Sequence, residues 1–129
     1  MALMEKPLVP TKKGKVTIGG KEADIVCSHF GNKILICVTH VCKFGTVIHI
    51  SKNQVPEGQS YSAETYSIRV LLGKDDELHN VFARGIGHHI LSNIQGTSPP
   101  SLLVSLSLWQ LTPDILKEVI HHLKSFSVW

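Results

Sequence analysis

Apolar residues recur at every second position from Lys15 to about Ile50, which is the spacing of β-strands with one buried face. Three short turn sequences divide this stretch: Gly19-Gly20, Gly31-Asn32 and Phe44-Gly45. Glycine accepts the positive φ that two-residue hairpin loops require. The pattern therefore predicts a meander of antiparallel strands.

The third of these strands differs from its neighbours, because residues 34–41 are apolar at both odd and even positions. Such a strand needs cover on both faces of its sheet. After a polar stretch at residues 51–63, alternation returns from Tyr66 to Leu72 and stops at Gly73. This predicts a fifth strand.

Two later segments have the spacing of amphipathic helices. In the first, the apolar residues repeat every four positions: Leu78, Phe82, Ile86, Ile90 and Ile94. Asp75 precedes them as the expected N-cap, and Gly85 and Gly87 predict that another element packs close. In the second, Thr112-Pro113 reads as an N-cap followed by proline at the first helical position.

Between the two helices, residues 101–109 alternate leucine and valine with serine, which predicts a sixth strand. The predicted fold class is α+β, with an about six-stranded, mainly antiparallel sheet built as a strand meander and two α-helices. The element order is βββββ-α-β-α. We assign residues 1–14 to an N-terminal tail and residues 15–129 to a single domain.

The composition supports one core. Of the 129 residues, 43% are hydrophobic and 18% are charged, which suits one domain without disulfide staples. The net charge of +3 is scattered and aromatic residues make up only 6%, so the chain lacks the basic stripe of a nucleic-acid-binding protein. It also lacks a signal-peptide hydrophobic region or a membrane-length apolar run. We expect a protein of the cytosol, or of the cytosol and nucleus, with no nucleic-acid or membrane partner.

The three cysteines, Cys27, Cys37 and Cys42, match neither a CxxC redox pair nor a zinc ribbon. Buried thiols acting as small hydrophobic side chains explain Cys27 and Cys37 better.

The eight histidines do not form a recognisable site. Neighbours on a helix, His88-His89 and His121-His122, diverge by about 100° and cannot share one ion. His29, His40 and His49 lie in separate strands and can converge, but no carboxylate or cysteine has ligand spacing to them. The acidic run at residues 75–77 is explained by a helix N-terminus. We expect no metal, cofactor or catalytic residue, and keep a histidine-dependent hydrolase or metal protein as the enzymatic alternative.

Two helices cover one face of a six-stranded sheet but hardly both. Leu35 or Ile36, Val47 or Ile48, and Leu103 would leave part of the second face apolar. Such a surface would mark a partner site and favour a dimer. The polar stretch 51–63 is a second candidate, because it lacks periodicity and is too polar for a core. The candidate partner-binding residues are Leu35, Cys37, Ile48, Val55, Tyr61 and Leu103. We expect the terminal Trp129 to be structural instead, since it closes an amphipathic helix.

Three sequence blocks carry a family resemblance over nearly the whole chain. They are residues 26–46, with VCSHF and KILICVT; residues 70–84, with VLLGKDDEL and VFAR; and residues 118–129, with EVI and the terminal VW. With these blocks the chain resembles the proteasome assembly chaperone 3 family.

The resemblance implies a non-enzymatic chaperone that uses no nucleotide and is absent from the finished proteasome. It also implies pairing with the paralogous assembly chaperone 4 and help for proteasome α subunits in forming the outer ring. Whether the isolated chain forms a homodimer stays open. The alternative function is a small scaffold or adaptor subunit of another complex, which the same fold would serve.

Overall fold

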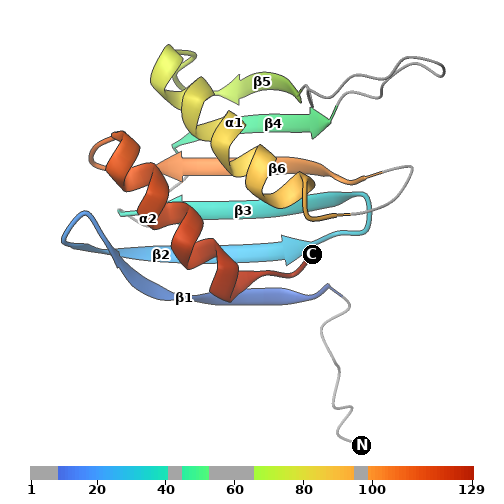
Figure 1. Ribbon diagram of the computed structural model, residues 1–129, viewed down its shortest axis with the longest axis horizontal. Coiled ribbons are helices and arrows are strands. Elements are labelled where there is room, and N and C mark those ends of the chain that lie inside the picture. The colour runs from blue at the N-terminus through green and yellow to red at the C-terminus, as the bar shows by residue number, and fades with distance from the viewer. Residues whose placement is uncertain (1–8, 41–44, 53–65, 95–98) are drawn as a thin grey trace, which may run out of the picture.

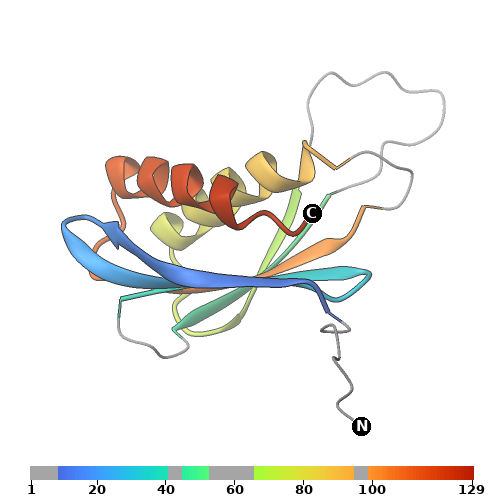
Figure 2. The same cartoon turned by 90° about the horizontal axis from the view of Figure 1, so that it is seen from below.

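The computed structural model describes residues 9–40, 45–52, 66–94 and 99–129, which form one sheet with two helices on one face (Figures 1 and 2). The elements are β1 (Thr11–Ile18), β2 (Lys21–His29), β3 (Lys33–Thr39), β4 (Thr46–Lys52), β5 (Tyr66–Leu72), α1 (Glu77–Leu91), β6 (Ser101–Ser107), α2 (Pro113–Leu123) and the short 3₁₀ helix η1 (Lys124–Phe126). The predicted fold class and element order are confirmed. None of the helices in these ranges is long and apolar enough to cross a bilayer.

The strand order is β1-β2-β3-β6-β4-β5. All pairs are antiparallel except β3 and β6, which run parallel. The sixth strand thus enters between β3 and β4 and limits the meander to β1–β3 and the β4–β5 hairpin. The sequence of β6 suits this central position, because most of its side chains are buried.

The domain begins earlier than the sequence suggested. β1 starts at Thr11, so residues 11–14, assigned to the tail, pair with β2 along a continuous register. The pattern missed this because Lys12 and Lys13 lie on an edge strand, where charged side chains are common. The polar stretch is also shorter at its start, since Ser51 and Lys52 belong to β4.

Each helix begins at a side-chain cap. Asp76, not Asp75, caps α1, and its carboxylate accepts a hydrogen bond from the His79 backbone N–H at 2.9 Å. Thr112 caps α2 as predicted, with Pro113 in the first turn. These caps satisfy N–H groups that have no partner within the helix.

The core lies between the helices and one face of the sheet. It contains Ile25, Ile36, Val104 and Ile48 from four strands, together with Phe82 from α1. Burying one such side chain contributes about 1.5–3 kcal/mol relative to leaving it in water. The core therefore fixes which sheet face is covered, and no helix of the described residues lies over the opposite face (Figure 2).

The glycines in α1 permit close packing, as predicted. A Cβ on Gly87 would lie 2.8 Å from Ile50 Cγ2 on β4, and one on Gly85 would lie 3.0 Å from Leu116 Cδ2 on α2. α1 therefore approaches both the sheet and the second helix.

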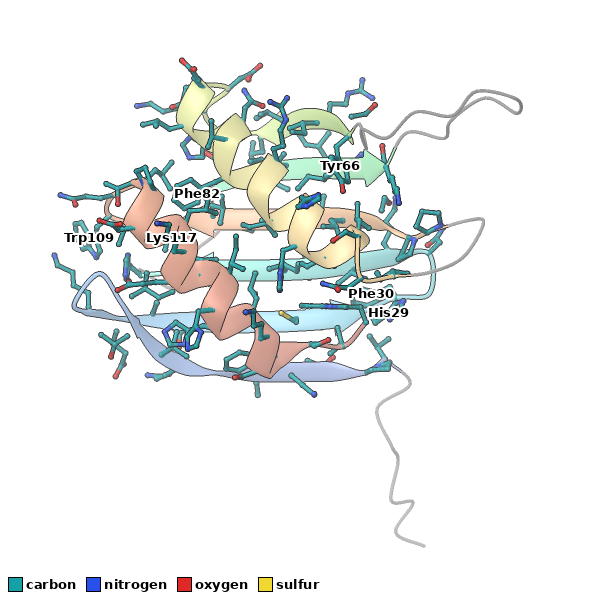
Figure 3. All side chains as sticks on the ribbon, viewed as in Figure 1. His29, Phe30, Tyr66, Phe82, Trp109 and Lys117 are labelled. Carbon is teal, nitrogen blue, oxygen red and sulfur yellow. The ribbon has the colours of Figure 1, made fainter. Side chains whose placement is uncertain are left out.

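The C-terminal segment packs onto the same core. Phe126, Val128 and Trp129 are partly buried against it. The Val128 carbonyl oxygen lies 2.9 Å from His29 Nδ1, so the end of β2 holds the segment in place (Figure 3). The packing of Trp129 agrees with its predicted structural role.

Candidate functional site

The uncovered face of the sheet is the candidate site, and strand register decides which side chains it carries. Residues directly opposite each other in neighbouring strands share a face. One row across it runs through Ser28, Leu35, Leu103, His49 and Arg69. The neighbouring row runs through Val26, Cys37, Ser105, Val47 and Leu72.

Apolar side chains are contiguous in these rows. We call them the open-face patch: Val26, Leu35, Cys37, Val47 and Leu103. All five are half-buried although neither α1 nor α2 covers them, because neighbouring strands crowd their sides. Leu72, at the edge strand, extends the patch and is 61% exposed. A contiguous apolar surface of this kind is typical of protein-binding faces.

The predicted binding residues divide into three groups. Leu35, Cys37 and Leu103 lie together on the open face, with Leu35 directly opposite Leu103. Ile48 was wrong as a binding residue, because it is fully buried on the helix-covered face. Val55 and Tyr61 lie outside the described residues.

The error at Ile48 has a simple cause. In β4 the alternation puts Ile48 and Ile50 on one face and Val47, His49 and Ser51 on the other. The more apolar set packs in the core, so Val47 takes the place predicted for Ile48. The polarity of the two sets along β4 was the signal that would have identified Val47.

Charged residues surround the open-face patch. They are four cations and two carboxylates: Lys13, Lys15, Lys33, Arg69, Glu22 and Asp24. Glu22 pairs with Lys15 at 3.3 Å, and both side chains are well exposed. Sequence reasoning missed this charge pattern, because its members come from four separate strands.

His49 lies within this charged surface. Burial lowers the pKa of its imidazole, and the nearby Lys33 and Arg69 lower the pKa further. Both effects disfavour the imidazolium form. This end of the open face is thus short of negative charge.

The cysteines behave as hydrophobic side chains. Burial raises the pKa of Cys27 to about 12, with a smaller contribution from Cys37. Burial also raises the pKa of Cys37. Neither thiol has the thiolate character of a nucleophile at neutral pH. The remaining cysteine, Cys42, lies outside the described residues.

The strand histidines do not converge. His29 contacts the C-terminal segment, whereas His40 Nε2 donates to the Ile18 carbonyl and its Nδ1 accepts from the Trp109 N–H. His49 faces the open side of the sheet. Across the described ranges, no three His, Cys, Asp or Glu side chains come close enough together to hold a metal ion. Within those ranges the geometry thus offers an apolar binding surface and no metal site.

Comparison with known proteins identifies relatives over nearly the full chain. A family model described as Proteasome assembly chaperone 3 matches residues 36–126. The mouse protein named Proteasome assembly chaperone 3 is 27% identical over 125 residues, covering 97% of this chain and 98% of its own. The protein of that name from Nematostella vectensis is 27% identical over 130 residues, covering 96% and 93%.

The fold is also similar to a solved structure. A chain from "Crystal Structure of a Novel Chaperone Complex for Yeast 20S Proteasome Assembly" superposes with a TM-score of 0.74. The two chains share 17% sequence identity, and the match covers 90% of this chain and 97% of that one. At this identity the comparison shows a shared fold.

Proposed function

The chain belongs to the proteasome assembly chaperone 3 family, and we propose that it is a non-enzymatic chaperone assisting assembly of the proteasome core particle. The family match over residues 36–126 is the observation that carries this proposal. The likeness to a chain of a chaperone complex for yeast 20S proteasome assembly supports it.

The chain works, in this proposal, as a heterodimer with the paralogous assembly chaperone 4. The open-face patch is the binding surface, because its apolar side chains lie on the sheet face that neither α1 nor α2 covers. The heterodimer promotes formation of the α ring by engaging proteasome α subunits.

Affinity capture of the tagged full chain from cells, followed by mass spectrometry, tests the function. We expect α subunits and the paralogous chaperone to co-purify without the β subunits that join late. Stable capture of an unrelated complex, with no proteasome subunit, would instead support the scaffold alternative.

The binding surface is tested with two matched substitutions. Leu35→Asp places a charge in the open-face patch, whereas Leu78→Asp changes a leucine that is 53% exposed on α1. We expect light scattering of the chain mixed with its paralogue to show loss of the heterodimer for Leu35→Asp alone. Equal binding by both variants, with unchanged melting temperatures, would exclude the open face as the interface.

A further inference from the structure

One corner of the open face gathers basic side chains from three strands, two of them cations. His49 on β4 lies directly opposite Arg69 on β5, and on its other side directly opposite Leu103 on β6. Lys33 begins β3, two residues before Leu35 on the same face. We call Lys33, His49 and Arg69 the cationic corner. It flanks the apolar pair Leu35–Leu103 directly.

The described part of the chain provides no carboxylate for this corner. The acidic residues of the open face, Glu22 and Asp24, lie on β2 beyond Val26. Asp24 lies opposite Thr39, which is six residues or about 20 Å along β3 from Lys33, and β4 lies three strand positions or about 14 Å from β2. That separation exceeds the screening length of about 8 Å at physiological salt, so these carboxylates do not neutralise the corner.

The corner also carries unfavourable like-charge interactions. Lys33 and Arg69 both disfavour protonation of His49, as does its partial burial. Covering this surface with an apolar partner would remove water from the cations and increase that cost. A negatively charged group placed there would relieve the repulsion and form charge-assisted hydrogen bonds with Arg69.

We propose that the cationic corner binds a carboxylate side chain of the partner protein that covers the open-face patch, which makes that partner acidic at this position and different from a second copy of this chain. The inference rests on the proposed function, because it assumes that the open face is the interface. It adds the chemistry by which the correct partner is recognised.

A second copy of the chain is a poor match for charge reasons. Its open face carries four cations against two carboxylates in the described ranges. Glu22 is already paired with Lys15, and Asp24 lies directly opposite Lys15 on β1. Two copies face to face would bring net positive surfaces together, which disfavours that association.

Charge reversal separates this inference from general surface effects. Arg69→Glu changes the cationic corner. Lys117→Glu makes the same change of net charge at an exposed residue of α2, on the helix side of the sheet (Figure 3). We expect Arg69→Glu to weaken binding to the purified paralogous chaperone at least about tenfold, and Lys117→Glu to leave it unchanged. Raising the salt from about 50 to 300 mM should weaken the wild type more than Arg69→Glu.

The outcomes distinguish the two proposals. If the wild type does not bind this partner, the proposed heterodimer is overturned and this inference with it. If Leu35→Asp abolishes binding but Arg69→Glu binds like the wild type, the interface stands and the carboxylate contact is wrong. A tight homodimer of the chain alone at low salt, disrupted by Leu35→Asp, would also overturn the inference.

A rescue experiment completes the test. Acidic residues of the paralogue are changed to lysine one at a time and mixed with Arg69→Glu. We expect one such variant to restore binding to Arg69→Glu while binding the wild-type chain poorly. Failure of every acidic position to rescue would contradict a direct carboxylate contact.

Discussion

At the scale of single residues, the two glycines of α1 have opposite expected sensitivities. Gly87→Ala places a methyl group 2.8 Å from Ile50 Cγ2, in the fully buried core. We expect a loss of about 1–3 kcal/mol in the free energy of unfolding, because a packed core does not absorb an extra methyl group. Gly85→Ala meets Leu116 Cδ2 at 3.0 Å, where a half-buried leucine can move aside. The helix propensity gain of up to about 1 kcal/mol then makes it neutral or stabilising. Urea unfolding measures both, and a larger loss for Gly85→Ala would contradict the packing argument.

Also at the scale of single residues, Asp76 makes the stability of the protein depend on pH. The hydrogen bond from the His79 backbone N–H lowers the pKa of its carboxyl, helped by the His79 side chain 2.7 Å away. A carboxyl whose pKa is lower in the folded state than in the unfolded state stabilises the protein at pH values above the unfolded-state pKa, near 3.9. This contribution is lost as the pH falls through the folded-state pKa. Asp76→Asn keeps an acceptor for the cap but has no charge. We therefore expect wild type to be the more stable at pH 7, with the difference in urea midpoint shrinking toward pH 3. A difference independent of pH would rule out the charge as its origin.

At the scale of elements, the C-terminal segment is expected to stabilise the sheet. Phe126 lies over Gly14 of β1, where a Cβ would come within 3.0 Å of its ring, and Val128 contacts His29 of β2. Deleting residues 126–129 removes this cover, so we expect a loss of about 2–4 kcal/mol and a melting temperature several degrees lower. Trp109, which is 61% exposed, provides the control: Trp109→Ser removes the contact of its ring with the Lys21 ammonium, 4.3 Å from the ring centroid, and should change stability by no more than about 1 kcal/mol. A truncated chain with unchanged melting but weaker partner binding would make the segment a contact element instead.

At the scale of the whole molecule, the remaining prediction concerns client capture. Residues 53–63 lie outside the described residues, and their polar, aperiodic sequence predicts a role in recognising α subunits. Replacing them with a short Gly/Ser linker should leave melting temperature and heterodimer formation unchanged while weakening capture of α subunits. Tyr61→Ala is the finer variant, because tyrosine is frequent at binding hot spots. If capture is unchanged in both variants, the segment is a spacer and clients bind elsewhere.

The sequence by itself determined the elements and most of their ends. Apolar spacing of two or four residues, glycine turns and helix caps act over a few neighbouring positions, so β5, its end at Gly73 and the Thr112 cap were all predictable. The paired placement of Leu35 and Leu103 follows from β3 and β6 being neighbours, a contact between segments more than sixty residues apart.

Only the tertiary structure decided that β6 enters between β3 and β4. It also decided which face of β4 packs in the core, so that Val47 and not Ile48 joins the patch. The cationic corner arose in the same way, because its three residues become neighbours only when hydrogen bonding sets the order and register of four strands.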